Sequence, residues 1–88
     1  MRLIIFELKA FEQYQEWIKT DKKVSIRISD LIIEAAKNPF TGRGKPEPLK
    51  GNWKGYWSRR IDDEHRLVYK ITDDTIIIAL CYGHYNDK

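Results

Sequence analysis

The stretch YWSRRIDDEHRLVYKITDDTIIIALCYGHY, residues 56–85, decides the fold of this chain. It contains three segments rich in apolar residues, at 56–61, 65–71 and 76–85, and the polar turns DDE and TDDT separate them. Bounded segments of this kind predict β-strands. Strands joined by such short turns pair antiparallel, so the stretch predicts a three-stranded meander whose last and most apolar strand is central.

Two helices are predicted on the N-terminal side of the meander, after a short strand at residues 2–6. Apolar residues recur at helical spacing from 8 to 19, and a second helix begins at a cap supplied by Thr20 or Asp21. The step from Asn38 to Pro39 ends this second helix. Its apolar stripe consists of Val24, Ile28, Leu31, Ile32 and Ala35.

The predicted order of elements is therefore β-α-α-β-β-β. Helices with a minimal connection pack as an antiparallel hairpin. We expect an α+β fold in which an antiparallel sheet carries the helical hairpin on one face. The other face can stay open to water and carry polar groups. With 88 residues and no repeats, residues 1–88 are expected to form a single domain.

The composition narrows the class of protein further. A single cysteine, Cys81, excludes an internal disulfide and a cysteine-based metal site. The longest apolar run near the N-terminus, LIIF at residues 3–6, is shorter than the core of a signal peptide or a membrane helix. We therefore expect a cytoplasmic protein with no membrane partner.

The loop at residues 39–55 holds all three prolines and four of the five glycines. Around it, residues 42–60 contain six Lys or Arg and one acid, Glu47, which sits between two prolines. Prolines stiffen the backbone, so Glu47 lies in a pre-extended frame. A basic segment of this kind is either a solvated loop or a surface that attracts a polyanion.

Metal-independent cleavage of RNA needs a base for the 2′-hydroxyl, an acid for the leaving oxygen and cations for the phosphate. Glu47 can serve as the base, and His84 as the acid, because histidine changes charge near neutral pH. The candidate cations are Arg59, Arg60, Arg66, Lys50 and Lys54. The aromatic residues that can stack on bases are Trp53, Tyr56, Trp57, Tyr82 and Tyr85.

Each of these residues also has a purely structural interpretation. Glu47 can be a solvated charge and His84 an incidental one. Arg66 can pair with Asp62 or Glu64 across the turn. Trp53 and Trp57 can cap the core, and His65 can be structural or exposed. Two histidines 19 residues apart form no metal motif, and GRGK at 42–45 lacks the features of a nucleotide-binding loop. No cofactor is expected.

One pair of residues suggests a protein partner. Ile26 and Ile33 point nearly opposite the core stripe of the second helix. Exposed isoleucines are common, so the pair is either ordinary surface or part of an interface.

The segment DLIIEAAKNPFTGRGKPEPLKGNWKGYWSRRIDDEHRLVYKI, with the later HY, closely resembles the YoeB (Txe) group of the RelE toxin superfamily. The resemblance spans nearly the whole chain, and the motifs GKPEPLK, WSRRI and EHRLVY carry it together. It implies a microbial-ribonuclease-like α+β fold and a ribosome-dependent mRNA interferase. Such a toxin cuts mRNA in the ribosomal A site and leaves a 2′,3′-cyclic phosphate. A YefM-type antitoxin neutralises it, and operator DNA is bound only through the antitoxin complex.

The resemblance also implies roles for individual residues. It places the general base on Glu47, the general acid on His84 and transition-state stabilisation on Arg66. The remaining implied site residues contact or position the substrate: Lys50, Arg60 and Tyr85.

The C-terminal motif departs from the family pattern. This chain has CYGHY where the family reads like CRYHY, and NDK follows Tyr85. Gly83 beside His84 is expected to loosen the acid.

Two other functions are consistent with the residues. A non-cleaving module can bind RNA or the ribosome and block translation by occlusion. A protein-interaction domain can use Ile26 and Ile33 as its surface, and that stripe also permits a homodimer.

Overall fold

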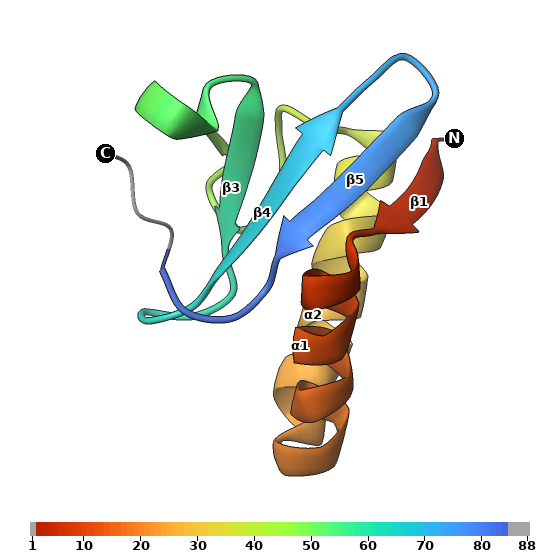
Figure 1. Ribbon diagram of the computed structural model, residues 1–88, viewed down its shortest axis with the longest axis vertical. Coiled ribbons are helices and arrows are strands. Elements are labelled where there is room, and N and C mark those ends of the chain that lie inside the picture. Colours follow the sequence, from red (N-terminus) through yellow and green to blue (C-terminus); the bar gives the residue numbers. More distant parts are fainter. Residues whose placement is uncertain (1, 85–88) are drawn as a thin grey trace.

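The computed structural model describes residues 2–84. A sheet carries a pair of helices on one side, and Figure 1 shows the two helices running side by side. The elements are β1 (Leu3–Phe6), α1 (Leu8–Thr20), α2 (Lys22–Lys37), β2 (Glu47–Pro48), the 3-10 helix η1 (Gly51–Trp53), β3 (Tyr56–Arg60), β4 (Arg66–Ile71) and β5 (Thr75–Leu80).

The helical hairpin has the boundaries that its sequence predicts. Asp21 is the single residue between α1 and α2, and its carboxylate accepts a hydrogen bond from the Val24 backbone N–H at 3.4 Å. Asp21 therefore ends one helix and caps the next. At the other end, α2 stops at Lys37, before Asn38 and the proline that follows it.

The strand order in the sheet is β1-β5-β4-β3-β2. The antiparallel meander of β3, β4 and β5 is confirmed, and β5 is an interior strand, although β4 occupies the middle. The short strand β2, which the sequence places in a loop, pairs antiparallel with β3 at the edge.

The pairing of β1 with β5 is parallel, with Leu3 opposite Thr75 and Phe6 opposite Ile78. The α+β class is confirmed, but the prediction of a wholly antiparallel sheet is wrong for this pair. Parallel neighbours need a long crossover connection, and here the chain between them includes both helices. Four apolar residues carry no signal of that direction, because it depends on how the helices pack.

The main core lies between the helices and the sheet. Its buried residues include Ile28, Leu31 and Ile32 of α2 and Leu67, Tyr69, Ile76 and Ile78 of the sheet. A smaller cluster of Leu49, Val68 and Ala79 lies apart from the helices, with Trp53, Tyr56 and Leu80 packed against it. The two α-helices thus cover one face of the sheet.

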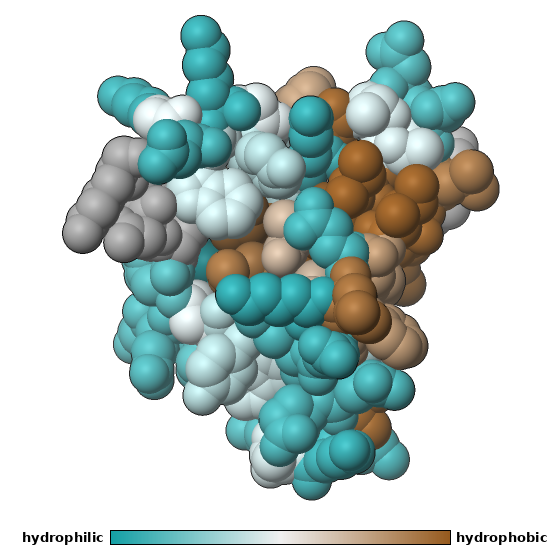
Figure 2. Space-filling model, in the orientation of Figure 1, coloured by the Kyte–Doolittle hydropathy of each residue, from teal (hydrophilic) through white to brown (hydrophobic). Residues whose placement is uncertain are grey.

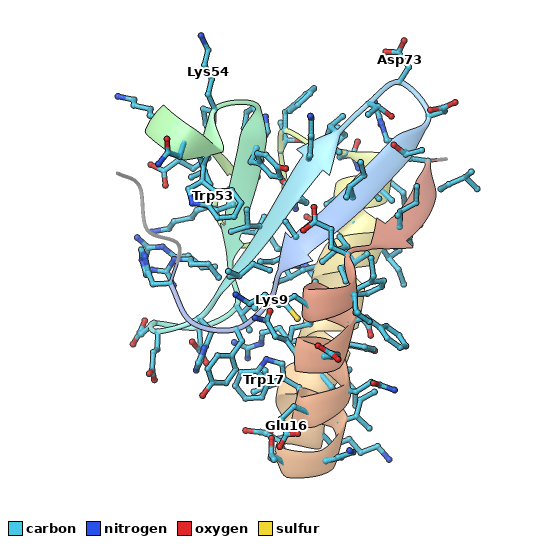
Figure 3. All side chains as sticks on the ribbon, in the orientation of Figure 1. Lys9, Glu16, Trp17, Trp53, Lys54 and Asp73 are labelled. Atoms are coloured by element: carbon cyan, nitrogen blue, oxygen red, sulfur yellow. The ribbon has the colours of Figure 1, made fainter. Side chains whose placement is uncertain are left out.

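Strand β5 ends at Leu80, earlier than the predicted 76–85. The next residue bonds to α1 instead of to a strand. The Cys81 backbone N–H donates to Gln13 Oε1 at 2.8 Å, and Trp17 Nε1–H donates to the Cys81 carbonyl at 2.8 Å. Side chains of α1 therefore replace the strand partner, and Figure 3 shows Trp17 projecting from α1 toward this segment.

The surface carries apolar residues around β1. Leu3, Ile4 and Ile5 are exposed there, and Figure 2 shows apolar side chains gathered at that edge of the molecule. Ile26 and Ile33 of α2 are also exposed, as the sequence predicts, at 54% and 44%. Among residues 2–84 there is no helix with the length and apolar character needed to cross a membrane.

Candidate active site on the open face of the sheet

Strand register determines which side chains lie on the face opposite the helices. Glu47 of β2 pairs with Ser58 of β3, and Ser58 pairs with Val68 of β4. Directly paired residues share a face, and Val68 belongs to the cluster that lies apart from the helices. Glu47 and Ser58 therefore face the same way, and we call this side of the sheet the open face.

Two arginines lie side by side on the open face. Arg60 of β3 pairs directly with Arg66 of β4. Arg60 is two residues after Ser58 and Arg66 is two residues before Val68, so both lie on the open face. Paired Cβ atoms lie about 4.5–5.5 Å apart, and like charges at that spacing repel. Within residues 2–84 neither arginine forms an ion pair with an acid. The fold therefore keeps a local concentration of positive charge.

Glu47 lies diagonally across the β2–β3 pair from Arg60, because Arg60 is two residues beyond its partner Ser58. Diagonal neighbours of this kind are about 7–8 Å apart. Glu47 is exposed, and its backbone is held in extended geometry by β3. The carboxylate is thus placed on a rigid strand within reach of a group bound to the arginines.

Arg66 is oriented by the turn that precedes β4. Its Nη1 donates to the carbonyls of Asp62 and His65 at 2.8 and 3.1 Å. It does not pair with the Asp62 carboxylate, because Asp62 Oδ1 accepts the backbone N–H groups of Glu64 and His65 at 2.9 and 2.7 Å. Burial raises the pKa of the Asp62 carboxyl, but these two bonds and nearby positive charge together hold it below its usual value.

The segment after β5 brings His84 to the same end of the sheet. The Arg66 backbone N–H donates to the Gly83 carbonyl at 2.9 Å, and His84 follows directly in the chain. His84 is exposed. The structure thus places His84 beside the start of β4, where Arg66 and Arg60 lie.

The other predicted substrate contacts lie at the margin of this site or beyond the described residues. Lys50 is exposed and precedes η1, and its carbonyl accepts the Trp53 N–H at 3.1 Å. Trp53 packs edge-on against Tyr56, 5.0 Å between ring centroids, and Figure 3 shows it beside β3. Tyr85 lies outside the described residues.

Arg59 does not belong to the site, although the sequence includes it among the candidate cations. Its side chain is 0% exposed, and it alternates with Arg60 to the helix-facing side of β3. Its guanidinium donates to Tyr69 Oη and Glu34 Oε2 and to three carbonyls, of Asn38, Thr41 and Arg43. Arg59 is therefore an internal tie that holds the loop.

Two aromatic residues also have structural partners. Trp57 packs against Phe40, 4.8 Å between centroids, and against the main core. Tyr82 packs against Trp17 and His65 but remains half exposed. The sequence alternative in which Trp57 caps the core is the one that the structure supports.

A cavity of about 270 Å³ adjoins Arg60 and extends the basic surface. It is lined by Arg27, Leu31, Arg43, Gly44, Arg60 and Ile61. Arg27 and Arg43 are not among the candidate cations predicted from the sequence. Arg43 lies in the basic segment and could have been found there, whereas Arg27 is in α2 and reaches the cavity only through the fold.

Cys81 is excluded as a nucleophile. The residue is fully buried, and burial raises the pKa of its thiol to about 12. A thiol in that state carries almost no thiolate at neutral pH. Residues 2–84 also contain no cluster of three or more His, Cys, Asp or Glu side chains that could hold a metal ion.

The comparisons with known proteins agree with one another on the family. The sequence profile of the YoeB-like toxins of bacterial type II toxin-antitoxin systems matches residues 6–85. The toxin YoeB of Streptomyces coelicolor is 55% identical over 82 residues, which cover 93% of this chain and 98% of that protein.

Solved structures agree at the level of the fold. A YoeB/ParE toxin from Agrobacterium tumefaciens superposes with a TM-score of 0.91 at 42% identity, covering 97% of this chain and all of that one. The YoeB dimer from Staphylococcus aureus gives a TM-score of 0.88 at 46% identity, covering 96% and 98%. The YoeB–YefM complex from the same organism gives 0.87 at 46% identity, covering 97% and 100%. This chain therefore belongs to the YoeB-like toxin family of bacterial type II toxin-antitoxin systems.

Proposed function

We propose that this toxin is a metal-independent endoribonuclease that cuts mRNA in the ribosomal A site and so stops translation. The observation that carries the proposal is the open face itself, where the paired Arg60 and Arg66 lie beside Glu47. Adjacent arginines that form no ion pair with an acid among residues 2–84 suit a phosphodiester, which can bridge two guanidinium groups. An exposed carboxylate beside them then meets the sugar hydroxyl of the same nucleotide.

The reaction follows from these positions. Glu47 takes the proton of the 2′-hydroxyl, and the 2′-oxygen attacks the adjacent phosphorus. Arg66 and Arg60 stabilise the charge that builds on the phosphate oxygens. The bond to the 5′-oxygen breaks as His84 donates its proton to that oxygen. The products are a 2′,3′-cyclic phosphate and a 5′-hydroxyl, and no metal or cofactor takes part.

Binding of the message extends beyond the reacting phosphate. The cavity lined by Arg27, Arg43 and Arg60 continues the positive surface beside Arg60, and Lys50 lies three residues beyond Glu47 in the chain. Positive charge along a path of this kind attracts the nucleic-acid backbone without reading its sequence. Tyr85 is proposed to help place the substrate. The ribosome then supplies the alignment that a small, open site lacks.

The partners follow from the family. The S. aureus relative forms a complex with YefM and also a dimer. We propose that a YefM-type antitoxin neutralises this chain, that operator DNA is bound only through that complex, and that the chain can form a homodimer. A cytoplasmic location follows from action on the ribosome.

The test is cleavage by Glu47→Gln on a ribosome programmed with an empty A site. Loss of the general base is expected to lower the rate about 10²–10⁴-fold. The matched control is Glu12→Gln, which removes an exposed carboxylate from α1 and is expected to leave the rate unchanged. Mapped product ends should show a 2′,3′-cyclic phosphate.

A second arm contains the same message free in solution with EDTA. Cleavage only on the ribosome supports the proposal. Intact message on ribosomes that still bind the toxin would contradict it and support the occluding module instead. Wild-type cleavage by Glu47→Gln would remove Glu47 from the mechanism.

A further inference from the structure

His65 directly precedes Arg66 in the chain and bonds to Gly83, which directly precedes His84. Its Nδ1 accepts a hydrogen bond from the Gly83 backbone N–H at 2.7 Å. The next residue, Arg66, donates its backbone N–H to the Gly83 carbonyl at 2.9 Å. Both polar backbone groups of Gly83 are thus held by consecutive residues at the start of β4.

The acceptor role of Nδ1 defines the form of His65 in this contact. A ring nitrogen that accepts a hydrogen bond carries no proton, so the neutral ring carries its proton on Nε2. Nε2 lies 3.7 Å from Glu64 Oε1, which is beyond hydrogen-bond length. Among residues 2–84, the bond from Gly83 is therefore the hydrogen bond that orients the ring.

Packing also restricts the orientation of the ring. His65 is 8% exposed, and its ring lies edge-on to Trp17 at 4.8 Å and tilted against Tyr82 at 4.7 Å between centroids. Trp17 in turn donates to the Cys81 carbonyl at 2.8 Å. Residues 81–83 are thus attached to α1 and to His65 at successive positions.

The contacts at Gly83 restrain a flexible residue. Its φ is +74°, a conformation that glycine adopts readily, and a glycine without restraints samples many others. The sequence predicts that Gly83 loosens the neighbouring His84. The structure shows both backbone groups of Gly83 bonded, so the expected freedom is restrained.

We infer that His65 is a positioning residue for RNA cleavage: by accepting the Gly83 N–H it sets the place of His84 relative to Arg66. The inference rests on the proposed function of His84 as the general acid. His65 itself touches neither substrate nor reacting atoms. It acts through the backbone of residues 83 and 84.

The first test compares two substitutions of His65 that differ in the acceptor. In His65→Asn the side-chain oxygen can occupy the place of Nδ1, whereas His65→Leu keeps the volume and has no acceptor. Cleavage is measured on programmed ribosomes. His65→Leu is expected to lower kcat about 10–100-fold with KM unchanged, because small misplacement of a reacting group costs that much. His65→Asn is expected to retain most of kcat.

Stability is measured on the same proteins so that misfolding is not mistaken for misplacement. His65→Gln serves as a second variant if His65→Leu does not fold, because its longer side chain carries the acceptor away from the position of Nδ1. Equal kcat for the Asn variant and the variant without a placed acceptor would overturn the inference. The inference would also be overturned if the decrease in kcat across the variants simply paralleled the decrease in their urea midpoints of unfolding.

A second readout does not depend on cleavage. In the wild-type protein, NMR should show an unprotonated, hydrogen-bonded Nδ1 on His65 and a Gly83 amide protected from hydrogen exchange. Protection should fall in His65→Leu and persist in His65→Asn. If the wild-type protein cuts no RNA but these signals behave as expected, the proposed function fails, and the role of His65 in holding Gly83 is still supported. If Gly83 exchanges freely in the wild type, the inference fails whatever the activity.

Discussion

Replacing Arg59 by methionine tests whether this residue is an internal tie and not a substrate contact. Methionine matches the length of the side chain but donates no hydrogen bonds. The change leaves behind the acceptors that Arg59 now satisfies. These are Tyr69 Oη at 3.0 Å, Glu34 Oε2 at 3.2 Å, and the carbonyls of Arg43 at 3.1 Å, Thr41 at 2.9 Å and Asn38.

The magnitude follows from burial. Removing one partner of a buried, charged network costs about 3–5 kcal/mol. Here Tyr69 Oη and three carbonyls lose a donor, while Glu34 keeps its ion pair with Arg43. A domain of this length has a free energy of unfolding of roughly 4–13 kcal/mol. With a urea m-value of about 1–1.5 kcal/mol per M, the midpoint of unfolding should fall by about 3 M. The loop that leads to Glu47 should also lose protection from hydrogen exchange, because three of its carbonyl contacts end at Arg59.

The matched control is Arg60→Met, one residue along the same strand but on the open face. Exposed substitutions of this kind change stability by about 0.5 kcal/mol or less. Arg60→Met should therefore unfold like the wild type while cutting RNA more slowly. Equal urea midpoints for wild type and Arg59→Met would refute the reasoning, and so would an equal loss of stability in the two variants.

Three further predictions concern the loop glycines, the thiol of Cys81 and the stability of the protein at acidic pH. Gly44 and Gly55 both have positive φ, so alanine at either should cost about 1 kcal/mol; at Gly44 a Cβ would also lie 3.1 Å from a β3 carbonyl, and a further ~1 kcal/mol is expected. Urea unfolding of both variants checks this, and an equal loss would contradict it. Cys81, with its pKa near 12, should react with a thiol reagent about a thousandfold more slowly than in the unfolded chain; fast labelling of folded protein would show that the thiol is accessible. Hydrogen bonds from the backbone and side chain of Arg43 lower the pKa of Glu34 below 4.5. The ionised Glu34 carboxylate therefore stabilises the folded state fully above that value, and this stabilisation is lost as pH falls through the folded-state pKa. Urea midpoints from pH 7 to pH 3 should fall, and Glu34→Gln should flatten the decline; an identical decline would exclude Glu34.

Several features of this protein could be predicted from sequence because their signals are local. Asp21 caps α2 and Pro39 stops it, and both effects act within one turn of helix. The meander of β3, β4 and β5 follows from three apolar segments and two short turns. The motifs around Glu47 and Arg66 indicated the family, and the comparisons confirm it.

Other features depended on packing between distant segments. Arg59 and Arg60 are adjacent and chemically identical, and alternation along a strand says only that they face opposite ways. Which of them is buried depends on which face the helices cover. The parallel direction of β1 and the early end of β5 have the same origin, because both are decided by contacts made across the fold.

Local chemistry in the sequence thus determined the two α-helices, the strands of the meander, their order along the chain and the family to which the chain belongs. Tertiary structure alone decided that Arg59 is a tie while Arg60 lies on the open face, and that His65 holds Gly83 from 18 residues away. The physical reason is that capping, turns and periodicity act over a few residues. Burial and hydrogen-bond partners depend instead on which distant segments the packed helices bring together.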